Sequence, residues 1–136
     1  MNNYERACGL AWEWAHHRAK LSPQMTRTVE LGLAAPHARY VEAVRLAERC
    51  RIRLDQLMGK LDVLLAPAVN GEAPMGLHYA GDPAFQSLWT LLHVPTISLP
   101  LAEGPNGMPV GVQLVAKRWD DRTLLEVAQW VMDRRE

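Results

Sequence analysis

The sequence predicts an α/β protein with a partial mixed β-sheet of about three strands, flanked by helices. Charged residues and apolar residues at helical spacing fill the chain up to about residue 59. Short apolar runs bounded by glycine and proline follow, and such runs are typical of strands. Helical patterns alternate with these runs towards the end of the chain. We therefore expect a mainly helical segment over 1–59 and a strand and helix segment over 60–136.

Three helices are expected in the first segment. One covers residues 4–20, and the next begins with Ser22 as its N-cap and Pro23 at its first position. The third begins after Pro36 and ends at Gly59. Its apolar residues follow the spacing of one buried stripe, which comprises Tyr40, Val44, Ala47, Cys50, Leu54, Leu57 and Met58.

The second segment is expected to begin with a strand over 61–66. Its run of apolar residues is continuous, which is typical of a strand buried on both faces in a parallel sheet. A loop rich in glycine and proline follows. Asp82 and Pro83 then predict the start of a helix over 84–92.

Two strands and a helix are expected to complete the chain. The strands cover 96–101 and 110–117, and a turn with two glycines joins them. Asp120 or Asp121 caps the closing helix, whose predicted buried face comprises Leu124, Leu125, Ala128, Val131 and Met132. Strands as apolar as these need neighbours on both edges, so we expect further strands to come from outside this sequence.

Composition excludes several classes of function. The 136 residues include 15 basic and 15 acidic ones, and no basic stripe predicts a nucleic-acid partner. No apolar run approaches the ~20 residues that span a bilayer, and the first residues lack a signal-peptide pattern. The histidines lack ligand spacing, so no metal or other cofactor is expected. A cluster of arginines is interpreted as a solvated helix surface: Arg45, Arg49, Arg51 and Arg53.

The two cysteines, Cys8 and Cys50, form neither a disulfide framework nor a zinc motif. We expect both to be small buried apolar residues. Such cysteine usage is typical of a reducing compartment, so the expected location is the cytoplasm.

Three stretches carry a resemblance to a known family: LDVLLAPAVNGEAP, GDPAFQSLWTLLHVPTISLPLAEGPNGMPVGVQLVAKRWDD and TLLEVAQW. In their order and spacing they resemble the C-terminal segment of amidase-signature enzymes. The helices of the first segment resemble those that precede this block, more loosely. The resemblance implies that the chain is an incomplete piece of the amidase-signature α/β/α fold.

The resemblance also implies an amide hydrolase. In that family a serine attacks the amide carbonyl, a second serine on a cis peptide relays a proton to and from a lysine, and backbone N–H groups of a glycine- and serine-rich loop hold the oxyanion. This sequence contains no such loop. Its serines are Ser22, Ser87 and Ser98, and its lysines are Lys20, Lys60 and Lys117. None of them matches a catalytic position, so no catalytic residue is assigned.

The helix over 84–92 is the expected contribution to a substrate pocket. Phe85 and Trp89 are four residues apart and share a helix face, and we expect them to line an acyl or leaving-group pocket with Gln86 at its edge. The alternative, that Phe85 and Trp89 are ordinary core residues, stays open. Gln113 lies inside a predicted strand, and a structural amide is the favoured interpretation for it.

Three interpretations of the whole chain remain. The first is a truncated product of an amidase gene, inactive alone, and it is favoured because Met1 falls inside a continuous helical region. The second is a stand-alone, non-catalytic binding module. The third is one chain of a split amidase. An amide substrate is expected only in the full enzyme, and the expected protein partner is the missing N-terminal part or a second copy of this chain.

Overall fold

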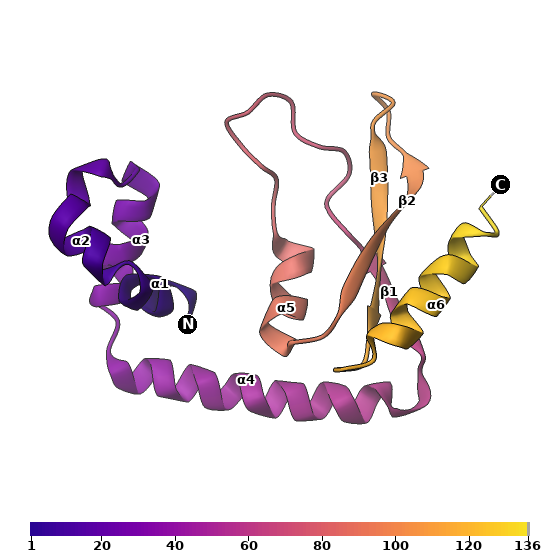
Figure 1. Cartoon of the computed structure of the whole chain (residues 1–136), viewed down its shortest axis with the longest axis horizontal. Coiled ribbons are helices and arrows are strands. Elements are labelled where there is room, and N and C mark those ends of the chain that lie inside the picture. Colours follow the sequence, from indigo (N-terminus) through magenta and orange to yellow (C-terminus); the bar gives the residue numbers. More distant parts are fainter. Residues whose placement is uncertain (136) are drawn as a thin grey trace. The chain divides into compact units, whose positions relative to one another are not determined.

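The computed structural model describes residues 1–135. The chain separates into two compact units, Met1–Arg49 and Cys50–Glu136, and each is described by itself. Helix α4 (His37–Leu57) contributes residues to both. Figure 1 labels the helices and strands used below.

The first unit is helical. It contains α1 (Asn2–Gly9), α2 (Ala11–His17), a short 3₁₀ turn and α3 (Pro23–Leu33). The single helix predicted over 4–20 is therefore wrong, because the backbone turns at Leu10 (φ −103°, ψ 18°). This break follows Gly9, and glycine is a poor residue for a helix interior. Ser22 is confirmed as an N-cap, since its Oγ accepts a hydrogen bond from the Met25 N–H at 3.2 Å.

Helix α4 carries the predicted apolar stripe, but the stripe is only partly buried. Ala47 and Met58, which lies in the 3₁₀ turn after α4, are buried, whereas the side chain of Leu57 is 58% exposed. Cys8 and Cys50 are both exposed, so the prediction that they are buried is wrong. Helical spacing establishes which residues share a face, but it does not supply an element to cover that face.

The second unit is built on a three-stranded sheet with the order β1-β3-β2. Its strands are β1 (Val63–Pro67), β2 (Thr96–Glu103) and β3 (Pro109–Ala116). The α/β class and the three strands are confirmed. The predicted mixed pairing is wrong, because both ladders are antiparallel. β1 and β2 run in the same direction, but β3 lies between them, so no parallel ladder forms.

Helices α5 (Ala84–Leu92) and α6 (Asp121–Met132) lie on opposite sides of this sheet (Figure 1). The α6 side is the apolar core, in which Leu124 and Ala128 pack with Leu99, Leu114 and Ala116. Asp120 caps α6 through Oδ1, which accepts from the Thr123 N–H at 3.4 Å.

Two predictions of burial fail in this unit. Leu125, expected on the buried face of α6, is 58% exposed. Leu65 of β1, expected to be covered on both faces, is 69% exposed. β1 is an edge strand, and an edge strand has a neighbour on one side only. Among residues 1–135, no helix is both long and apolar enough to cross a membrane.

Candidate functional site

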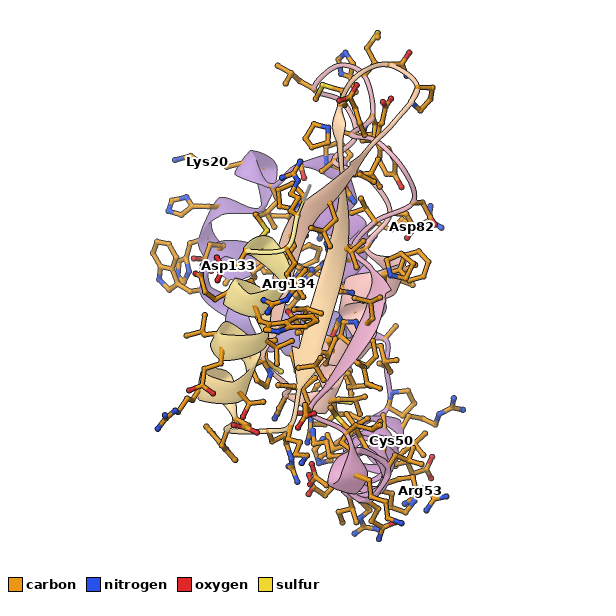
Figure 2. The ribbon with its side chains drawn as sticks, turned by 90° about the vertical axis from the view of Figure 1, so that its right-hand side faces the viewer. Lys20, Cys50, Arg53, Asp82, Asp133 and Arg134 are labelled. Atoms are coloured by element: carbon orange, nitrogen blue, oxygen red, sulfur yellow. The ribbon has the colours of Figure 1, made fainter. Side chains whose placement is uncertain are left out.

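The site predicted from the sequence lies on the first two turns of α5. The helix begins at Ala84 as predicted, because Asp82 Oδ1 accepts a hydrogen bond from the Ala84 N–H at 3.0 Å. Asp82, labelled in Figure 2, marks this end of the helix. Ser87 Oγ donates to the Pro83 carbonyl at 2.9 Å. The helix ends at His93, whose φ of 57° lies in the left-handed region.

Gln113 attaches the first turn of α5 to the sheet. Its side chain is on β3 and the residue is only 3% exposed. Its Nε2 donates to two carbonyl oxygens, that of Pro67 at the end of β1 (3.1 Å) and that of Phe85 in α5 (3.0 Å). The interpretation of Gln113 as a structural amide is therefore confirmed. A buried amide with both N–H groups engaged fixes the two elements against each other.

A second side-chain amide supports the same junction. Gln86 Nε2 donates to the carbonyl of Ala68 at 3.3 Å, and the Ala68 N–H donates to the carbonyl of Gly111 at 3.0 Å. Gly111 permits this approach because it has no side chain. A Cβ there would lie 2.7 Å from Ser98 Oγ and 3.1 Å from the Ala68 Cβ. The end of β1 and the start of α5 therefore meet over the middle of β3.

Phe85 and Trp89, the other predicted pocket residues, are both half-buried on α5. The indole Nε1 of Trp89 is buried and has no hydrogen-bond partner among the described residues. Such an orphaned donor costs stability, so the surroundings of Trp89 satisfy its apolar part better than its polar part.

Arg51 holds the other end of α5 and was missed by the sequence reasoning. It lies in the part of α4 that belongs to the second unit, and it is 9% exposed. Its Nε donates to the Leu91 carbonyl at 2.9 Å, and Nη2 is 3.0 Å from His93 Nε2. The interpretation of this arginine as solvated surface is wrong. Its three neighbouring arginines, Arg45, Arg49 and Arg53, are exposed, and nothing in the pattern of arginines distinguishes the buried one.

The serines do not form a nucleophilic site within this part of the fold. Ser22 and Ser87 bond to backbone atoms of their own helices, and Ser98 lies beside Gly111 on β2. Over residues 1–135, no hydrogen bond joins a serine hydroxyl to a lysine or histidine, and no group of three or more metal-ligating side chains forms. The arrangement positions a helix but offers no activated nucleophile.

Comparison with known proteins identifies similar chains. The family model described as Amidase matches residues 9–125. A subunit of the glutamyl-tRNA(Gln) amidotransferase of Synechococcus sp. (strain WH7803) is 32% identical over 137 residues, which cover 91% of this chain and 28% of that protein.

Solved structures give the same picture. A crystal structure of an amidase superimposes with a TM-score of 0.88 and 29% identity, covering 98% of this chain and 33% of the amidase. An inhibitor-bound chain, described as part of a vestigial protein complex that reveals the evolutionary origins of an s-triazine catabolic enzyme, gives a TM-score of 0.84 at 25% identity, covering 96% of this chain and 32% of that one. The chain thus spans about a third or less of the relatives it matches.

Proposed function

This chain belongs to the amidase family, and we propose that it is the C-terminal part of an amide hydrolase, without amidase activity unless residues from outside this sequence are present. It has a partial α/β fold with a three-stranded sheet, similar to a third of a solved amidase. The proposed reaction is hydrolysis of a carboxylic amide to an acid and ammonia or an amine. The serine nucleophile, the relay serine and the lysine come from the remainder of the enzyme.

One observation carries this proposal. The chain superimposes on 33% of an amidase with a TM-score of 0.88, yet none of its three serines is placed next to a base. An acyl-transfer enzyme needs a nucleophile within hydrogen-bond reach of a base, and backbone donors directed at the oxyanion. Ser22 and Ser87 use their hydroxyls in helix contacts instead.

The proposed contribution of this part is one wall of the substrate pocket. Phe85 and Trp89 present an aromatic face on α5, with Gln86 at its edge. Support comes from the rigid attachment of the helix, because Gln113 and Gln86 bond its first turn to the sheet and Arg51 bonds its last turn to α4. Specificity sites need such held side chains, since small displacements cost discrimination.

Hydrolysis assays test the proposal directly. The purified chain should hydrolyse aliphatic and aryl amides at the buffer rate. Mixed or co-expressed with the remaining two-thirds of the solved amidase, it should give turnover that a serine-directed inhibitor abolishes. If the chain alone turns over amides, and the triple variant S22A/S87A/S98A loses that turnover, the nucleophile lies in this chain and the proposal is wrong.

The pocket role has its own readout in the assembled enzyme. Trp89→Ala should change the ratio of kcat/KM between bulky and small amides, because removing an indole from a pocket wall affects large substrates most. A uniform loss for all amides would assign Trp89 to the core instead.

A split enzyme is the second candidate, and the exposed edge strand β1 favours it. Leu65 on that strand is 69% exposed, and apolar surface of this kind is typical of a covered interface. The DNA upstream of Met1 separates the cases. An in-frame or frameshifted lysine codon followed by a glycine- and serine-rich loop indicates one amidase gene, whereas a second gene that encodes them indicates a split enzyme. If neither occurs, the stand-alone binding module is the remaining interpretation.

The proposed location is the cytoplasm, where Cys8 and Cys50, both exposed and free, stay reduced. The proposed protein partner is the rest of the amidase, and a second copy of this chain is the alternative. A formal net charge of zero gives no support to a nucleic-acid partner.

A further inference from the structure

The loop between β1 and α5 is fixed at Glu72 by three hydrogen bonds. Glu72 Oε1 accepts from the Asn106 N–H at 2.8 Å and from the Met108 N–H at 3.2 Å. Glu72 Oε2 accepts from the Asn106 side-chain Nδ2 at 2.6 Å. All three donors belong to the turn between β2 and β3, so one carboxylate links two segments that are far apart in the sequence.

The β2–β3 turn is shaped to receive this carboxylate. The Gly104 N–H donates to the Met108 carbonyl at 2.9 Å, and Gly107 has a φ of 77°, which favours glycine. This geometry leaves the N–H groups of Asn106 and Met108 directed at one point, as in the backbone nests that bind anions. Gly104 also lacks a side chain where Glu72 lies, and a Cβ there would collide with the glutamate.

We propose that Glu72 is a positioning residue, which holds the loop between β1 and α5 on the β2–β3 turn, and that loss of its negative charge releases the loop. Charge-assisted hydrogen bonds are about twice as strong as neutral ones. Without them, the long loop towards Asp82 is attached only at its ends. The anchor is a property of this chain, and its consequence for the pocket wall on α5 rests on the proposed function.

Acid should release the loop in the same way as a substitution. The hydrogen bond from the Asn106 side chain, and then the bonds from the Asn106 and Met108 backbone, lower the pKa of Glu72. A carboxyl whose folded pKa is lowered stabilises the fold at pH values above its unfolded pKa, and this contribution is lost as the pH falls through the folded pKa. The anchor should therefore persist at neutral pH and be lost at a pH below the ordinary range of glutamate.

Glu103 is the other titratable side chain at this contact. It ends β2, and its Oε1 would lie 3.8 Å from a Cβ at Gly107. Residues 104–108 of the turn carry no titratable side chain. Glu103 makes no hydrogen bond through its carboxylate within residues 1–135, so Glu103→Gln is a matched control that removes the same charge from the same turn.

Hydrogen exchange of the full chain tests the anchor. The reporters are the Asn106 and Met108 amides, which donate to Glu72. In Glu72→Gln and Glu72→Ala, we expect both amides to exchange about three to ten times faster. Glu103→Gln should leave them unchanged. Gly104→Ala, which displaces Glu72 from the turn side, should reproduce the effect, and circular dichroism should show retained secondary structure.

Unchanged exchange in both Glu72 variants, or equal acceleration in Glu103→Gln, would overturn the anchor. In the assembled amidase, Glu72→Gln should raise KM about threefold and change kcat less, because the loop leads into the pocket wall. Equal changes in the two constants would remove its role at the pocket. Absence of any amidase activity with the wild-type chain would reject the proposed function, whereas the exchange result on the chain alone would still decide the anchor.

Discussion

Gly111 allows three elements to meet because one side chain is missing. It lies on β3, where Ser98 of β2 approaches from one neighbour and Ala68 from the end of β1. The Ala68 N–H donates to the carbonyl of this glycine. A well-packed site of this kind tolerates added volume poorly.

Gly111→Ala should therefore lower the free energy of unfolding by about 1–3 kcal/mol, as overpacking of a full site does. Gly59→Ala is the control, since nothing lies within 4 Å of a Cβ there, and its effect should stay within about 0.5 kcal/mol. Urea denaturation measures both. Adding Ser98→Ala to Gly111→Ala should restore part of the loss. A neutral Gly111→Ala would contradict the packing described here.

Trp89 presents the opposite situation, because it has a polar atom without a partner. Its buried Nε1 lacks an acceptor among the described residues, and an unmade bond of this kind costs about 1–3 kcal/mol. Trp89→Phe removes the donor and keeps an aromatic ring, so the free energy of unfolding should change by less than about 1 kcal/mol. Trp89→Ala should lower it by about 2 kcal/mol or more. Similar losses in the two variants by chemical denaturation would mean that the indole N–H has an acceptor.

At the scale of elements, helix ends were the most predictable features. Ser22, Asp82 and Asp120 each bond a backbone N–H at the start of a helix. These contacts are local, and the sequence specifies them within three residues.

Burial depends on elements far apart in the sequence and was predicted less well. Leu125 fits the apolar stripe of α6 but lies beyond the sheet, and Arg51 is buried among arginines that are exposed. The strand order β1-β3-β2 had no local signal either. A continuous apolar run describes both a central parallel strand and the exposed edge strand β1. Of the candidate site, the sequence predicted α5 and the amide role of Gln113, but neither its two acceptors nor the contact of Glu72 with the turn.

The attachment of α5 can be tested at Gln113. Gln113→Leu removes both donated hydrogen bonds and leaves the Pro67 oxygen without that donor. We expect the free energy of unfolding to fall by about 2–3 kcal/mol. Amide exchange in the first turns of α5 should rise more than in α6. Gln24→Leu, at an exposed position of α3, is the control and should change stability by less than about 0.5 kcal/mol. Equal exchange in α5 and α6 would contradict a local attachment.

At the scale of the whole molecule, the sheet of the second unit ends in two unpaired strands. Within residues 1–135, β1 and β2 each pair only with β3. Leu65 on β1 is 69% exposed, and a groove of about 570 Å³ beside β1 is lined by Leu61, Val63 and Trp130, among others. Exposed apolar edges template pairing with other chains.

The isolated chain should therefore associate, with a size that grows with concentration in size-exclusion chromatography, and should bind a hydrophobic dye. Leu65→Lys should reduce both effects, because lysine on an edge strand disfavours pairing. Leu125→Lys is the matched control, since Leu125 is similarly exposed but lies on a helix. A monomeric wild-type chain with a sharp, reversible two-state melt would contradict this expectation.

The central place of β3 also sets the timing of assembly during translation. β1 leaves the ribosome first, and its only partner strand within residues 1–135 follows after the Glu72 loop, α5 and β2 have been made. At roughly 5–20 residues per second, β1 waits for several seconds as a single apolar strand. The β2–β3 hairpin closes almost at once, because its strands are joined by one short turn. The sheet is therefore completed from its C-terminal hairpin backwards, and a pause late in synthesis prolongs the period in which nascent β1 is open to chaperones.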